Sequence, residues 1–149
     1  MTDSKYGKYI ITERKPKSRD LEMERPDAPG PDMTKVAMSL DDEYLKGAFV
    51  EICAWIVKAY PNNVWARAHT HEWDEVINFF GSDVDNIKDL GGEIEFWIED
   101  EKFILTKSST IFIPKGVKHC PLIIKRVDKP IFHFICAPAK KYEEHLVKE

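Results

Sequence analysis

Short runs rich in β-branched and aromatic residues recur between Val36 and Pro138, with polar residues alternating through many of them. The eight clearest runs lie at residues 49–57, 64–71, 74–80, 93–99, 102–106, 109–114, 120–125 and 130–137. Turn-forming residues such as Gly91 and Gly92 separate them, and no segment between them has the periodicity of an amphipathic helix. This pattern predicts an all-β domain of antiparallel strands, arranged as a sandwich or a barrel.

The two ends of the chain lack this pattern. Residues 1–35 hold four of the nine prolines and few large apolar side chains. Because proline has no amide hydrogen to donate in a central strand or a helix interior, this segment is predicted to be an extended arm. At the other end, two apolar residues spaced by four among charged residues predict a short helix at Lys140–Lys148. We therefore expect an arm at 1–35, a β domain at 36–138 and a short helical tail at 139–149.

Composition and charge narrow the class of protein. The chain has 149 residues, of which 43% are hydrophobic and 32% charged, as expected for one folded domain and not for a disordered chain. The formal net charge of −4 gives no electrostatic reason to bind nucleic acid or an anionic membrane surface, so neither is an expected partner. No apolar run approaches the ~18 residues that a membrane-spanning helix needs.

Cysteine usage and the first residues favour a cytoplasmic protein. The three cysteines, Cys53, Cys120 and Cys136, are an odd number and form no Cys-x-x-Cys pair. A disulfide framework and a thiolate zinc site are therefore not expected. The polar first residues also lack the apolar stretch of a secretory signal, so the cytoplasm is the expected compartment.

Three of the five histidines stand in a pattern that suits a metal site. His69 and His71 are two residues apart in an expected strand, so their side chains would lie on one face, about 7 Å apart along the backbone. Glu75 is the second residue of the next expected strand and would enter beside both imidazoles if its face lines the interior. His119 follows a Pro-x-Gly turn that leads into another strand. A single His-x-His pair is better explained by ordinary surface or core histidines, but the four positions together favour a site.

These residues form the motifs His-Thr-His-Glu-Trp-Asp-Glu, at 69–75, and Pro-Lys-Gly-Val-Lys-His, at 114–119. With both motifs in this order, the strand-rich region resembles the cupin superfamily. The family's first motif is a His-x-His pair followed after three or four residues by Glu, and its second contains Pro-x-Gly-x-x-His. Asn63, Ser108 and Ile123 stand where the family has Gly, Gly and Asn. These departures concern turn geometry and subfamily, and none is at a ligand position.

The resemblance implies a single cupin-type jelly-roll barrel with a metal ion in its mouth, bound by His69, His71, Glu75 and His119. Three imidazoles and one carboxylate suit a divalent ion such as iron(II), manganese, nickel, cobalt or zinc, and iron(II) is the preferred candidate. An octahedral ion with four protein ligands would keep two positions for water, oxygen or substrate. Open positions of this kind are what a catalytic metal site requires.

Alternation along the strands predicts what surrounds the ligands. Trp65 and Arg67 share the strand face of the paired histidines, so both are expected to point inward and to contact substrate. A buried Arg67 would pair with an internal carboxylate or with a carboxylate of the substrate. Ile77 and Phe79 share the face of Glu75 and are candidates for the pocket lining, although ordinary core packing is the simpler interpretation of both.

Three residues are candidates for other chemistry at the site. Glu75 could leave the ion and accept a proton. His133, in the last long strand, could be an acid or base, although a histidine hydrogen-bonded within the wall is the simpler alternative. Cys120 directly follows His119 and is expected to face the opposite way, which argues against a sulfur ligand.

The predicted function is that of a metal-dependent enzyme acting on a small organic acid or aromatic compound. Oxygenases are frequent among small cupins with all four ligands, so the resemblance favours a dioxygenase-type oxidoreductase. Two alternatives stay open: an isomerase or lyase in which the ion polarises a carbonyl, and a non-enzymatic cupin that binds or senses a small ligand. Cupins of this size resemble dimers more often than monomers, so a homodimer is expected.

Overall fold

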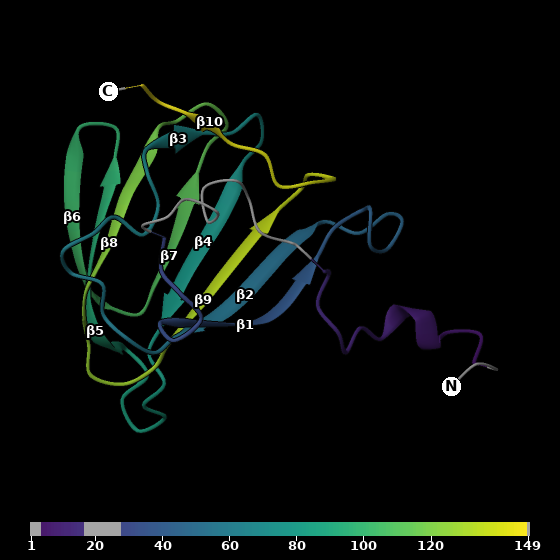
Figure 1. Ribbon diagram of the computed structural model, residues 1–149, viewed down its shortest axis with the longest axis horizontal. Coiled ribbons are helices and arrows are strands. Elements are labelled where there is room, and N and C mark those ends of the chain that lie inside the picture. The colour runs from purple at the N-terminus through teal and green to yellow at the C-terminus, as the bar shows by residue number, and fades with distance from the viewer. Residues whose placement is uncertain (1–3, 17–27, 149) are drawn as a thin grey trace.

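The strands lie in two antiparallel sheets in the computed structural model, which describes residues 4–16 and 28–148 (Figure 1). The first sheet has the order β1-β2-β9-β4-β7, and the second has the order β10-β3-β8-β5-β6. The bounds are β1 Thr34–Leu40, β2 Val50–Ile56, β3 His69–Thr70, β4 Glu75–Phe80, β5 Asp89–Ile98, β6 Glu101–Lys107, β7 Ser109–Ile113, β8 His119–Val127, β9 Ile131–Ala137 and β10 His145–Leu146. Within the described ranges there is no α-helix, and a 3-10 turn, η1, spans Gly7–Tyr9. The all-β prediction is confirmed.

The two sheets do not close into one barrel. Among the described residues no strand of one sheet pairs with a strand of the other, so β1 and β7 are the edges of the first sheet and β10 and β6 those of the second. The predicted closed barrel is therefore wrong, and the open arrangement of two layers forms instead. Alternation alone could not separate these two outcomes, because both bury every second residue of each strand.

The C-terminal tail forms a strand where a helix was predicted. His145 pairs with Thr70 and Leu146 with His69, so β10 extends the second sheet along the edge of β3. The two apolar positions that suggested a helix are too few to stabilise so short an isolated helix in water. Pairing with β3 satisfies main-chain groups that an unpaired edge would leave to solvent.

The strands follow the predicted runs closely except near the site. The run predicted at 64–71 contains only the two-residue strand β3, because the chain before it forms just an isolated bridge between Ala66 and Leu122. Strand β1 lies ahead of the eight runs that we singled out. Of the predicted arm, residues 17–27 lie outside the described residues, and the amide of Lys15 donates to the carbonyl of Ser39 in β1 over 3.0 Å.

The core lies between the inward faces of the two sheets. Ile56, Ile77 and Phe79 of the first sheet belong to the same buried cluster as Ile94 and Phe96 of the second. Each large side chain buried in this way contributes about 1.5–3 kcal/mol relative to leaving it in water. The site described below lies in the same interior, at the end of the sheets where β3 and β10 meet (Figure 1).

No helix in the described ranges is long and apolar enough to cross a membrane.

Candidate metal centre

Three buried histidines come together where β3 meets β8. His69 lies in β3, directly opposite His119, the first residue of β8. His71 follows β3 and projects to the same side as His69, in agreement with the His-x-His spacing. The ring centroids are 4.3 Å apart for His69 and His119, 4.7 Å for His69 and His71, and 5.1 Å for His71 and His119. One ring nitrogen of each histidine lies within 4.8 Å of those of the other two.

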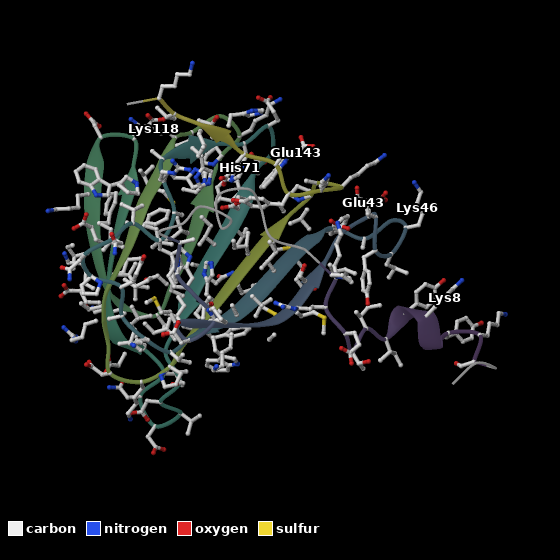
Figure 2. All side chains as sticks on the ribbon, in the orientation of Figure 1. Lys8, Glu43, Lys46, His71, Lys118 and Glu143 are labelled. Carbon is white, nitrogen blue, oxygen red and sulfur yellow. The ribbon has the colours of Figure 1, made fainter. Side chains whose placement is uncertain are left out.

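All three imidazoles are held in one tautomer by the main chain. Their Nδ1 atoms donate to carbonyl oxygens over 2.7, 2.6 and 3.0 Å, in the pairs His69–Arg67, His71–Glu143 and His119–Val117. Figure 2 shows His71 and Glu143 close to one another at the end of the molecule where β10 lies. Because a carbonyl can only accept, the proton is on Nδ1 and the lone pair is on Nε2. This is the arrangement of a histidine that binds a metal through Nε2.

Glu75, the first residue of β4, lies beside two of the three imidazoles. Its Oε2 is 3.1 Å from Nε2 of His71, and its Oε1 is 3.5 Å from Nε2 of His119. The Glu75 side chain is only 2% exposed. The four residues of the two motifs are therefore brought together, with Glu75 next to His71 and His119.

The buried atoms of this cluster lack hydrogen bonds. Nε2 of His71, Nε2 of His119 and Oε2 of Glu75 have no hydrogen-bond partner among the described residues, despite lying close together. A buried polar atom without a partner costs about 1–3 kcal/mol. A divalent cation would satisfy all three atoms at once, and imidazole nitrogens with a carboxylate are a donor set that transition metals accept. The residues present therefore fit a metal ion.

The protonation states agree with this donor set. Burial and, to a lesser extent, the neighbouring His119 together lower the pKa of His69 from 6.5 to about 3. Burial by itself would raise the pKa of Glu75, but His119 and His71 outweigh burial and lower that pKa to about 2. At neutral pH the cluster thus offers a neutral imidazole at His69 and a charged carboxylate at Glu75.

A second carboxylate, which the sequence analysis did not single out, lies at the same cluster. Oε2 of Glu144 is 3.6 Å from Nε2 of His69, and the Glu144 side chain is 9% exposed. The hydroxyl of Tyr142 donates to the same Oε2 over 3.0 Å. Both residues come from the tail that was predicted to be helical, and a helix there gave no reason to place them at the site. The pairing of β10 with β3 is what brings them in.

A cavity of about 70 Å³ adjoins the cluster. It is lined by Trp65, Ala66, His69, Glu75, Ile77, Phe96, His119, Cys120, Leu122, His133, Ile135, Tyr142 and Glu144. The predicted pocket residues Trp65 and Ile77 do line it. Phe79 is fully buried and stacks on His133, with ring centroids 4.6 Å apart, and is not part of the lining.

Arg67 does not point inward as expected. It is exposed and is not part of the cavity lining, although its carbonyl oxygen orients His69. The expectation assumed regular alternation from Trp65 to His71, but the chain before β3 is not a continuous strand. With the alternation interrupted, an arginine two residues before a buried histidine can remain at the surface.

His133 is a buried wall residue of the cavity. Its Nδ1 donates to the carbonyl of Asn78 over 3.1 Å, and burial lowers its pKa to about 4. It is therefore a neutral imidazole at neutral pH.

Cys120 also lines the cavity, although it was expected to face away from His119. Its φ is +68°, which breaks the alternation of the strand at this position. Cys120 is not part of the three-histidine cluster.

No protein-family model and no curated protein sequence matches the chain. Several solved structures do match the chain. The polyketide cyclase RemF from Streptomyces resistomycificus is 21% identical, and the match covers 82% of this chain and 76% of that one with a TM-score of 0.51. An oxalate oxidase is 13% identical, with 87% of this chain and 63% of that one covered and a TM-score of 0.50. A cupin-2 domain from Rhodospirillum rubrum is 9% identical. The match covers 78% of this chain and 65% of that one, with a TM-score of 0.48.

At these identities the similarity concerns the fold alone. The matches to the two enzymes cover most of this chain. The structural neighbours are cupin proteins. The chain has the cupin fold, with its two sheets left open at their edges.

Proposed function

We propose that this protein is a metal-dependent enzyme that acts on a small organic acid or aromatic compound, by oxidation with dioxygen. The observation that carries the proposal is the set of inward-facing, buried donor atoms of His69, His71, His119 and Glu75. Keeping polar atoms buried without partners is unfavourable unless a ligand occupies the space between them.

Iron(II) is the preferred ion, with manganese, nickel, cobalt and zinc as the other candidates for this donor set. The ion would supply Lewis acidity and, for iron or manganese, the capacity to change oxidation state. His69, His71 and His119 would hold it through Nε2, each oriented by its Nδ1 hydrogen bond. Glu75 would hold it through a carboxylate oxygen.

The chain itself supplies binding, orientation and proton transfer. Trp65, Ile77 and Phe96 form an apolar part of the cavity wall, which would contact an apolar part of the substrate. A cavity of about 70 Å³ is small, so it would admit a small substrate or the reactive end of a larger one. Oε1 of Glu75, near His119, is placed to accept a proton from a molecule held in the cavity.

A metal-dependent isomerase or lyase is the second candidate, and one observation favours it. The Tyr142 hydroxyl and the Glu144 carboxylate are hydrogen-bonded to each other and both line the cavity. Proton abstraction next to a carbonyl needs a base and a proton donor close to the substrate, and this pair provides both. Among the structures with the same fold, one is an oxalate oxidase and another a polyketide cyclase, so the fold is compatible with either class.

Metal analysis tests the proposal first. We expect near-stoichiometric metal in the purified protein and little in His69→Ala. His145→Ala is a matched control, because this histidine is exposed and is not part of the cluster. Absence of metal from the unmodified protein, even after anaerobic reconstitution, would show that the proposed site is wrong.

Oxygen uptake then separates the two classes of reaction. The iron(II)-loaded protein is expected to consume oxygen with one of a panel of small aromatic and carboxylate compounds. Turnover under strict anoxia with zinc or manganese would instead establish isomerase or lyase chemistry. A ligand that binds to the metal-loaded protein without turnover, and binds equally to metal-loaded Glu75→Gln, would identify a binding protein.

A further inference from the structure

His133 carries a ring nitrogen that has no partner among the residues described by the structure. The residue is only 8% exposed, and it lines the cavity beside the metal centre. Its ring stacks on that of Phe79 at an interplanar angle of 14°, and its Nδ1 donates to the carbonyl of Asn78. No hydrogen bond or ion pair within the described ranges reaches Nε2. A ligand that supplies the missing partner would stabilise this atom.

The hydrogen bond at Nδ1 determines what Nε2 can do. The carbonyl of Asn78 can only accept, so the proton of the neutral ring is on Nδ1 and Nε2 is an acceptor. Burial lowers the pKa of His133 to about 4, so the ring is neutral at pH 7. The two ring nitrogens point in nearly opposite directions, so Nε2 is directed away from the main chain of β4 and towards the cavity. A ligand that contacts it must provide a hydrogen-bond donor.

His133 and the metal centre lie at different positions along the same cavity. β4 and β9 are neighbours in the first sheet (Figure 1), and His133 in β9 pairs with Phe79, four residues beyond Glu75 in β4. Four residues of a strand span about 13 Å. Because Glu75 and His133 both line the cavity, their side chains approach a bound molecule from its two ends. A molecule that binds the ion with one end would place its other end near His133.

We propose that His133 determines substrate specificity, because its Nε2 accepts a hydrogen bond from a hydroxyl group at the end of the substrate remote from the metal. The inference rests on the metal-dependent enzyme of the proposed function and narrows its substrates to hydroxylated organic acids, aliphatic or aromatic. A carboxylate at this end would face a lone pair. An ammonium group has three donors for the one acceptor of His133, and the neighbouring pair of Ile77 and Ile135 offers none. A hydroxyl group has one proton to donate and therefore fits.

Paired ligands on the zinc-loaded full chain test this proposal. The probes are para-hydroxybenzoate with benzoate, and 5-hydroxypentanoate with pentanoate, so the members of each pair differ only in the hydroxyl group. In isothermal titration we expect the unmodified protein to bind the hydroxylated member of at least one pair roughly 3–10-fold more tightly than its parent acid. This is the effect of one net hydrogen bond.

Two substitutions separate the acceptor from the structural role of the ring. In His133→Asn the amide nitrogen takes the place of Nδ1 and can still donate to the carbonyl of Asn78, but no atom replaces Nε2. In His133→Gln the longer side chain brings an amide oxygen, which is an acceptor, to the place of Nε2. We expect His133→Asn to lose the preference for the hydroxylated acid and His133→Gln to recover part of it. Ile135→Val is the control, because it changes the cavity lining without changing a polar atom and should leave the preference unaltered.

Nitrogen NMR of the histidines gives a second readout that needs only the unmodified protein. The Nε2 resonance of His133 should shift when the hydroxylated acid is added and should not shift with its parent. If the protein binds zinc but shows neither the preference nor this shift, or if a folded His133→Asn keeps the preference, the inference is wrong while the metal site stands. If the protein binds no zinc, the proposed function and this inference are both wrong. Thermal unfolding checks that the variants fold.

Discussion

His69 and His119 are direct partners across the antiparallel pair of β3 and β8, with ring centroids 4.3 Å apart. This one pair joins the two motifs through residues that are 50 positions apart in the sequence. A partner position in an antiparallel pair places two side chains on the same face of the sheet at close range. The register between β3 and β8 therefore determines whether a third imidazole reaches the His-x-His pair. A slip by one residue would turn one of the rings away.

Removal of the metal should destabilise the folded protein. A ligand that binds only the native state adds about 2.7 kcal/mol when its free concentration is 100 times the dissociation constant. For a chain of this size, that corresponds to a rise of roughly 5–10 °C in the melting temperature. We expect a chelator to lower the melting temperature by this amount and readdition of the metal to restore it. The melting temperature of His119→Ala should not respond to either treatment.

Acid should destabilise the metal-free protein in part through His133. Burial lowers the pKa of this imidazole from 6.5 to about 4, so the unfolded chain binds the proton more readily than the native state does. The contribution of neutral His133 to stability is complete above pH 6.5 and is lost as the pH falls towards 4. The two pKa values correspond to about 3 kcal/mol over this range, as an order of magnitude.

Denaturant unfolding at pH 7, 5.5 and 4.5, in the presence of a chelator, measures this effect. His133→Gln should be less stable at pH 7 but should lose less stability on acidification than the unmodified protein. Burial also lowers the pKa of His69, and the loss of stability in acid that this causes is expected to be the same in both proteins. Equal pH dependence of the two proteins would show that His133 does not titrate as we expect.

Replacing Trp73 with leucine should weaken metal binding without unfolding the protein. The ring of His71 stacks on that of Trp73 at a centroid distance of 4.0 Å and an interplanar angle of 11°. The stack holds the His71 ring in the orientation that directs Nε2 into the cluster. We expect a loss of up to about 10-fold in affinity, at the lower end of the range for groups that orient ligands.

Isothermal titration with zinc or cobalt(II) checks this prediction. Trp55→Leu is the control, because Trp55 is 38% exposed and lies in β2, outside the cluster. A loss of affinity in Trp55→Leu as large as that in Trp73→Leu would indicate a general loss of structure and not a local effect on His71.

Local sequence pattern predicted the strands and the grouping of the motif residues, because each depends on alternation along a strand. His69, His71, Glu75 and His119 lie together although the sheets do not close into the predicted barrel. The place of these residues depends on strand register and on the turn before β8. Neither depends on whether the sheet edges meet.

Features that depend on one segment meeting another were not predictable from the sequence. The position of Glu144 follows from the pairing of β10 with β3, and a nine-residue tail carries too little pattern to reveal a two-residue strand. Arg67 is exposed because the chain before β3 departs from regular alternation. Cys120 reaches the cavity because its backbone has a positive φ, which is uncommon for a residue with a side chain.

The outer face of the first sheet should form the interface of a homodimer. Trp55, Phe132 and Phe80 are partners across β2, β9 and β4, and the rings of Trp55 and Phe132 are 5.1 Å apart. Phe112 in β7 is 59% exposed. Trp55 and Phe80 are also exposed, and exposed aromatic side chains on one sheet face are typical of an interaction surface.

Light scattering should give the unmodified protein a mass of about twice 17.3 kDa. Phe112→Lys should shift it towards the monomer, because a charge buried in an apolar interface has no partner. Val84→Lys is the matched control, since Val84 is 85% exposed in the loop after β4 and outside the strands of this sheet. A monomeric unmodified protein would show that the prediction is wrong. A dimer that Phe112→Lys leaves intact would place the interface on another surface.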